Sequence, residues 1–177
     1  VGTLDIRGSL IGGAVDNVSN IPTTTQGGQI EILGNVSKLN ISGNVVAGQG
    51  DNTAIVAIGG DAKTITIGGS LIGGSHAGGS TGGARIFVNG VLASITVSGS
   101  LLGDAQDSAR IVLGTDHGSV RINGDIVGGN GDRSGTIDSP GMTKSLFIGG
   151  SIRGGAGLGS GSVDVNDATG KLAIFVR

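Results

Sequence analysis

The chain has 177 residues, of which 39 are glycine, with 37% hydrophobic residues, a formal net charge of −2 and no cysteine, tryptophan or tyrosine. This composition excludes collagen, which needs glycine at every third residue with abundant proline, and it differs from the highly charged composition of disordered segments. The lack of cysteine excludes a disulfide scaffold and a thiolate-bound metal. We expect one ordered domain, with no nucleic-acid partner and no insertion into a membrane, because basic clusters and long apolar runs are absent.

The first predicted element is a strand, which is indicated by two apolar residues that alternate with an outward-facing residue. It recurs seven times, at Leu4/Ile6, Leu39/Ile41, Ile65/Ile67, Ile95/Val97, Val120/Ile122, Leu146/Ile148 and Leu172/Ile174. A glycine-rich corner follows, written GSLIGG at 8–13 and again at 69–74, with close variants in the other repeats. Glycine at a fixed place indicates a tight turn, because it adopts positive φ without strain.

The second predicted element lies inside this corner, at one apolar residue six positions after each first-strand residue. These residues are Leu10, Val45, Leu71, Leu101, Ile126 and Ile152. The third element lies nine positions before each first strand, at Ile30/Ile32, Val56/Ile58, Ile86/Val88, Ile111/Leu113, Ile137/Ser139 and Val163/Val165. Ser139 is the polar exception, and Pro140 follows it, so we expect a kink there.

Only the loop from the second strand to the third varies in length, as it does in a solenoid whose insertions leave at one corner. The sequence therefore predicts an all-β, right-handed parallel β-helix with three strands per coil, about 26 residues per coil and six to seven rungs. The whole chain would form one solenoid domain. Its coils are expected at roughly 1–29, 30–55, 56–85, 86–110, 111–136, 137–162 and 163–177.

The pattern G-x-[LI]-x-[IV]-x-G-S-L-x-G-G resembles the glycine-rich repeats of large secreted bacterial surface proteins, akin to adhesin and autotransporter passenger domains. This resemblance covers nearly the whole chain. It implies a β-helical scaffold, a location outside the cell or on its surface, and a role as a stalk, fibre, surface coat or adhesin. It transfers no functional residue, because the shared motif belongs to the scaffold.

Few side chains suit catalysis, and we expect that the protein is not an enzyme. His76 and His117 are expected in solvated loops or corners. The run Asp116-His117-Gly118-Ser119 contains the letters of a catalytic triad, but neighbours in sequence rarely form a triad in space. The twelve aspartates and one glutamate are scattered, and no tryptophan or tyrosine is present to stack on a sugar.

No cofactor is expected, and calcium is a weak candidate for a metal. The stretch GGNGD at 128–132 differs by one position from the calcium-binding nonapeptide repeat. Aspartates in the variable loops could share an ion, or they could cap turns with their own side chains. The candidates are Asp51, Asp104, Asp107 and Asp132. Arg85 and Arg110 should stack on adjacent coils, so we expect Asp104 or Asp107 to neutralise them.

The residue after each second-strand position forms a mostly aliphatic column along the rod. Its members are Ile11, Val46, Ile72, Leu102 and Val127, with Arg153 in the last place. Two interpretations stay open. A sharp corner could bury both neighbours, or the column could point outward as an apolar ridge for lateral contacts.

Neither end of the predicted solenoid carries a polar cap, although solenoids generally need one. Open strand edges are templates for further strands, so the chain is expected to stack head to tail with its own copies or to be a segment of a longer solenoid. Seven first strands but six of each other kind imply that a junction shares or exchanges a strand. The expected contact residues are Val1, Leu4, Ile6, Leu172, Ile174, Phe175 and Val176. The sequence thus predicts a self-assembling extracellular fibre subunit, with a stalk or adhesin segment as the alternative.

Overall fold

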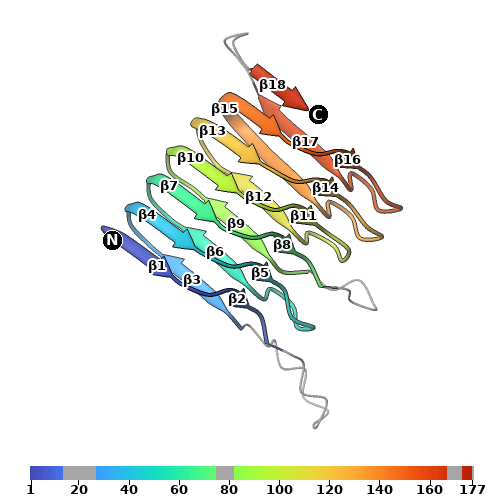
Figure 1. Cartoon of the computed structure of the whole chain (residues 1–177), viewed down its shortest axis with the longest axis horizontal. Helices are drawn as coiled ribbons and strands as arrows, with labels where there is room; N and C mark the ends of the chain where they lie inside the picture. The colour runs from blue at the N-terminus through green and yellow to red at the C-terminus, as the bar shows by residue number, and fades with distance from the viewer. Residues whose placement is uncertain (14–26, 75–81, 167–172, 177) are drawn as a thin grey trace.

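The computed structural model describes residues 1–13, 27–74, 82–166 and 173–176, the last of these by their backbone alone. Every regular element in these residues is a β-strand, and the coils lie side by side along one axis from the N-terminal to the C-terminal end (Figure 1). None of the described segments is a helix that is long and apolar enough to cross a membrane. The chain is thus an all-β solenoid.

Sheet 1 contains the predicted first strands, all of them parallel. Its order is β1 (Thr3–Ile6), β4 (Val36–Ile41), β7 (Ala62–Ile67), β10 (Leu92–Val97), β13 (His117–Ile122), β15 (Thr136–Ile148) and β18 (Ala173–Val176). Sheet 2 contains the short second strands, which have two residues each. They are β2 (Leu10–Ile11), β5 (Val45–Val46), β8 (Leu71–Ile72), β11 (Leu101–Leu102), β14 (Ile126–Val127) and β16 (Ile152–Arg153).

Sheet 3 contains the predicted third strands. They are β3 (Gln29–Ile32), β6 (Ile55–Ile58), β9 (Arg85–Val88), β12 (Arg110–Leu113), the first part of β15, and β17 (Ser162–Asn166). The long strand β15 belongs to both sheet 3 and sheet 1 and connects them. The pairing of β15 with β17 shifts register between Ser139 and Met142, which is the irregularity expected beside Pro140.

The register confirms the predicted coil. Leu39 pairs with Ile65, and Ile137 pairs with Val163, in both cases 26 positions further along the chain. All the strand pairs are parallel, as a solenoid requires. The all-β parallel solenoid with three strands per coil is therefore confirmed, whereas its right-handed winding stays a prediction.

The interior is filled by the inward aliphatic columns. Ile65, Ile95, Leu71 and Leu101 are fully buried, at 0% exposure. Burying one such side chain contributes about 1.5–3 kcal/mol, and the neighbours that bury it lie on adjacent coils. A coil is consequently stable only when another coil stacks against it.

A further buried column lies where the strands of sheet 1 begin, and the sequence analysis missed it. Its members are Val36, Ala62, Leu92, His117 and Thr143, which are 1–3% exposed. The strand bends just after this column, because Ala93 and Ser94 both face outward before Ile95 turns inward. This bend breaks the two-residue alternation on which the prediction relied.

The predicted register of the last strand was wrong. Leu172 and Ile174 were expected to stack on Leu146 and Ile148, but Ile174 pairs with Leu146 and Val176 pairs with Ile148. The step from Val163 to Ile174 is eleven residues, whereas the matching step from Ile137 to Leu146 is nine. Leu172 lies outside the described residues. The extra two residues show that this corner departs from the repeat.

Candidate functional site: coil edges and polar columns

The corner between sheet 1 and sheet 2 contains a polar column that runs the length of the rod. Its members are Ser9, Asn44, Ser70, Ser100, Asp125 and Ser151. From Ser9 to Asp125, the side-chain oxygen of each member accepts a hydrogen bond of 2.7–3.0 Å from the backbone N–H of the next member. We call this set the corner ladder. It explains why serine, asparagine or aspartate follows the first glycine of each GSLIGG-like motif.

A glycine precedes each ladder residue, and in every coil after the first it is required by the coil beneath it. These glycines are Gly8, Gly43, Gly69, Gly99, Gly124 and Gly150. A Cβ atom on Gly99 would overlap the hydroxyl oxygen of Ser70, and one on Gly150 would overlap the carboxylate of Asp125. The motif therefore serves the stacking of coils along the rod, because its glycine makes room for the hydrogen-bond acceptor of the preceding coil.

Both edges of the described solenoid expose part of the core column of sheet 2. Leu10 in the first coil is only partly buried, and Ile152 in the last is 39% exposed, whereas their equivalents Leu71 and Leu101 are fully buried. Figure 1 shows the strands β2 and β16 at opposite ends of the rod. The two edges thus present the same kind of surface.

Most of the predicted contact residues lie at these edges. Val1 is 66% exposed, and its amino group donates a hydrogen bond to the Asn35 carbonyl at 2.6 Å. Leu4 and Ile6 in β1 are partly buried. Ile174, Phe175 and Val176 form β18, which pairs with β15. Their role in assembly stays a prediction, as does that of Leu172.

The second residues of the sheet 2 strands form the predicted aliphatic column, which points away from the core. Ile11 is 64% and Leu102 is 38% exposed, while Val46, Ile72 and Val127 are half-buried. Their neighbours Val45, Leu71, Leu101 and Ile126 fill the interior at 0% exposure. The corner thus separates the inward residue from the outward one, and the column forms a ridge whose lateral contacts stay a prediction.

The loops that lead into sheet 3 contain a column of buried hydroxyl groups that the sequence analysis missed. Its members are Thr53, Ser108, Ser134 and Ser160. Each hydroxyl oxygen accepts the backbone N–H of a residue four or five positions earlier, at 2.8–2.9 Å. The next residue has positive φ, as at Ala54, Ala109 and Gly135. The signal was a serine or threonine followed by alanine or glycine directly before each of these strands.

A partly buried ionic cluster lies beside this hydroxyl column. The carboxylate of Asp107 contacts Arg110 at 2.7 Å and Arg133 at 2.9 Å, and Arg110 also contacts Asp138 at 2.5 Å. Of the two aspartates that the sequence offered as neutralising residues, Asp107 is the one that pairs with Arg110. Burial lowers the pKa of the stacked Arg85, whose guanidinium donates a hydrogen bond to the Asn52 side chain.

The calcium candidates do not come together in the part of the chain that the structure describes. No group of three or more histidine, aspartate or glutamate side chains there is arranged to hold a metal. Asp107 is engaged by two arginines, and Asp132 accepts the backbone N–H of Leu158 at 2.8 Å. Asp132 thus bonds to the next coil, which is neither a shared ion nor a cap on its own turn. Asp51 and Asp104 are partly exposed in their loops.

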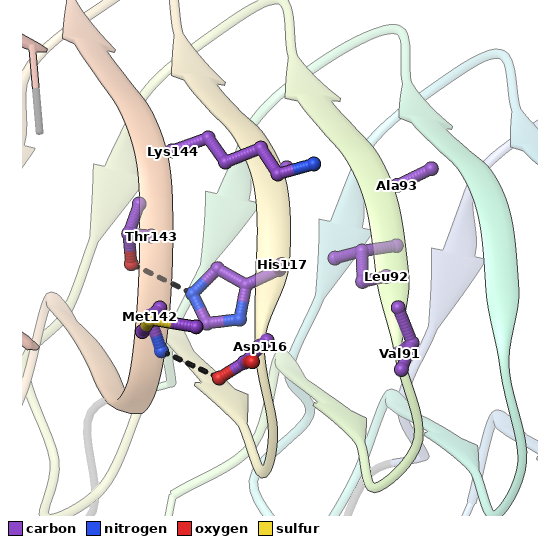
Figure 2. Close-up of a pocket in the computed structure, with 9 residues that line it drawn as sticks. Val91, Leu92, Ala93, Asp116, His117, Met142, Thr143 and Lys144 are labelled. Atoms are coloured by element: carbon purple, nitrogen blue, oxygen red, sulfur yellow. Dashed lines mark hydrogen bonds between the residues drawn. The ribbon is translucent and has the colours of Figure 1, made fainter. Parts of the chain in front are cut away.

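The expectation of a solvated His117 was wrong, because this residue falls in the buried column that includes Leu92. The residue is 3% exposed, and its Nδ1 donates to the Thr115 carbonyl at 2.5 Å. Nε2 lies 2.5 Å from the Ser139 hydroxyl and 2.8 Å from that of Thr143, toward which the ring points (Figure 2). Burial lowers the pKa of His117, so the ring is neutral and Nε2 accepts.

A surface hollow of about 760 Å³ lies over this bend, lined by residues that include Val91, Asp116, Met142 and Lys144 (Figure 2). His117 lines this hollow but is only 3% exposed, and its hydrogen-bond partner Ser139 is 2% exposed. The cluster therefore satisfies polar groups inside the core. His76 lies outside the described residues.

The fold places the protein in the class of parallel β-solenoids. Its polar columns stabilise the corners and the contacts between coils. No family model, curated protein or solved structure matches the chain.

Proposed function

We propose that the protein is a structural β-solenoid rod that belongs to a fibre or surface layer outside the cell and extends by end-to-end stacking of coils. The observation that carries this proposal is the corner ladder. The corner ladder continues through six successive described coils, and it ends in open edges at β2 and β16. Such edges bind a further coil by the contacts that hold neighbouring coils together.

The proposed mechanism is mechanical. An axial load would be shared among the backbone hydrogen bonds of three parallel sheets, which are supported by the side-chain bonds of the corner ladder. The two-residue strands of sheet 2 are too short to be stable alone, so their order depends on stacking. Function and stability would thus have the same physical origin.

The proposed extracellular location is supported by composition and by the repeat itself. The chain has few lysine and glutamate residues and abundant glycine, serine and threonine. Its glycine-rich repeat resembles those of large secreted bacterial surface proteins. A rod exposed to proteases also benefits from a backbone whose amides are largely engaged between coils.

A stalk or adhesin segment within a larger surface protein is the second candidate. The same observation favours it, because the open edges at β2 and β16 would equally accept further coils of one longer chain. In that case the rod would act as a spacer, and a binding site would lie elsewhere.

Negative-stain electron microscopy of the purified chain, over a range of concentrations at about neutral pH, separates the two candidates. We expect unbranched filaments of the width of one rod, together with a critical concentration in sedimentation. Short dispersed rods at every concentration would contradict self-assembly and favour the stalk.

A further inference from the structure

The first glycine of the corner motif in coil one has no internal reason to be glycine. In every later coil this position faces the side-chain acceptor of the coil beneath, which leaves no space for a Cβ atom. Around Gly8 the structure has nothing within 4 Å. The position is nevertheless glycine, followed by Ser9, as it would be if an acceptor lay beneath it.

An acceptor of the right kind lies at the opposite edge. Ser151 donates its backbone N–H to Asp125 at 2.7 Å, but no donor to the Ser151 hydroxyl oxygen is found among the described residues. In each preceding coil the equivalent oxygen accepts the N–H of the next ladder residue. Ser151 thus leaves one acceptor open, and Ser9 carries the N–H that occupies the matching place.

The backbone ladder of sheet 2 has the same complementarity. The amides of Ile126 and Gly128 donate to the carbonyls of Ser151 and Arg153, at 2.9 and 2.8 Å. One coil further on, the equivalent donors are Ile152 and Gly154, and the equivalent acceptors would be the Ser9 and Ile11 carbonyls of another molecule. The two edges therefore fit by continuing an existing pattern.

We propose that the Gly8–Ile11 edge of one molecule stacks on the Ser151–Gly154 edge of a second copy, head to tail. This inference rests on the proposed function and adds the partner, the contact and the polarity. A two-fold junction would place donors against donors or acceptors against acceptors, because every corner-ladder bond points the same way along the rod. The head-to-tail contact is heterologous, and it builds an open filament.

This junction also gives β18 a role. Among the described strands, sheet 1 has seven members, whereas sheets 2 and 3 have six each. When β2 of the incoming copy stacks on β16 and its β3 stacks on β17, its β1 reaches the edge of β15 that β18 occupies. Residues Ser145–Ile148 of β15 would then pair with Thr3–Ile6 of the incoming copy.

Strand β18 is the one that departs from the repeat, with eleven rather than nine residues between Val163 and Ile174. We therefore assign β18 as a replaceable cap, which covers β15 until the incoming β1 displaces it. Each added molecule then lengthens the filament by six coils.

Disulfide trapping tests the contact and its polarity, because the chain has no cysteine of its own. Stacked ladder residues lie about 4.8 Å apart, within the Cα separation that a disulfide spans. Mixing the Ser9→Cys protein with the Ser151→Cys protein under mild oxidation should give mainly the mixed 9–151 dimer. Dimers that join 9 to 9 or 151 to 151 would contradict the polarity, as would the absence of crosslinks in a protein that forms filaments.

Substitution at Gly8 tests the same contact without new chemistry. Gly8→Val should raise the critical concentration for filaments about tenfold or more, because the added side chain meets Ser151 of the next molecule. Its melting temperature should match that of the wild type. Ala93→Val is the control, since it adds a similar side chain on the exposed flank of the rod. Equal effects of the two substitutions would overturn the inference.

Removal of residues 167–177 tests the replaceable cap. The shortened chain should nucleate filaments faster than the wild type, and slower growth would contradict displacement of β18. If the wild-type protein forms no filaments at all, the proposed function itself fails. Filaments that ignore Gly8→Val contradict only the proposed junction.

Discussion

At the scale of single residues, glycine in this protein is placed by contacts between coils as much as by turn geometry. Gly99 lies against the hydroxyl of Ser70 and the backbone of Gly69, whereas Gly8 occupies the same place in its motif and meets nothing. The two residues are thus a matched pair, with the same sequence context and opposite surroundings.

This pair gives a direct prediction for stability. Gly99→Ala should lower the free energy of unfolding by about 1–3 kcal/mol, because the new Cβ overlaps the coil beneath. Gly8→Ala should leave the unfolding of the monomer unchanged, because its Cβ would lie in open space. Urea titration below the critical concentration measures both, and equal costs at the two sites would contradict the account.

His117 provides a pH-dependent prediction at the same scale. Burial lowers the pKa of His117, with opposing contributions from the Thr115 carbonyl and the charge of Asp116. The unfolded chain therefore takes up a proton at a higher pH than the folded chain, and stability should fall as the pH drops through about 6.5.

Replacing His117 by leucine should remove this contribution. Leucine is the natural choice, because Leu92 occupies the equivalent position in the neighbouring coil. We expect the melting temperature of the wild type to fall more steeply than that of His117→Leu between about pH 8 and about pH 5. His76 is present in both proteins, so it does not affect the difference. Parallel curves would show that His117 does not titrate on unfolding.

At the scale of elements, the loops into sheet 3 are stabilised by buried hydroxyl groups and by an ionic cluster rather than by apolar packing. Asp107 has positive φ and holds Arg110 and Arg133 at the start of neighbouring coils. Arg85 lies next to Arg110 in the same column, so without the Asp107 carboxylate only Asp138 would be left to balance the three arginines.

Asp107→Asn tests the cluster cleanly, because asparagine tolerates positive φ and keeps the size of the side chain. We expect a loss of about 1.5–3 kcal/mol in the free energy of unfolding, as for a hydrogen-bonded charge that loses its partners. The control is Asp104→Asn in the same loop, since no ion pair of Asp104 is found in the described part of the chain. Similar losses for both would contradict the assignment.

The strands could be predicted from the sequence because the offsets of six and nine residues repeat, and a repeated offset fixes the register of stacked strands. The column that contains Ala62 and His117 could not, because it mixes small, aromatic and polar residues just before a bend. The shift at β18 was missed because the regular offset of nine residues was extended to Leu172, although the chain adds two residues there.

For the candidate site, the sequence indicated which residues share a corner but not what their side chains do. The role of Ser70 and Asn44 depends on an oxygen reaching the N–H one coil away, a contact that no local pattern encodes. The partner of the stacked arginines was narrowed to two aspartates, and only the structure shows that Asp107 is engaged.

At the scale of the whole molecule, the rod has a direction. The corner ladder donates from each coil to the one before it, and the two edges of the described solenoid are complementary rather than alike in hydrogen bonding. A polar filament with one growing junction follows from this direction. Its stiffness would arise from the same bonds that order each coil.

The axial step of the filament, measured by cryo-electron microscopy with helical reconstruction, tests this account most directly. If β1 of each incoming molecule replaces β18, each molecule adds six coils, and the step should be about 29 Å at the usual spacing of strands. A step of about 34 Å, which corresponds to seven coils, would contradict the displacement of β18. A two-fold axis across the filament would contradict head-to-tail stacking altogether.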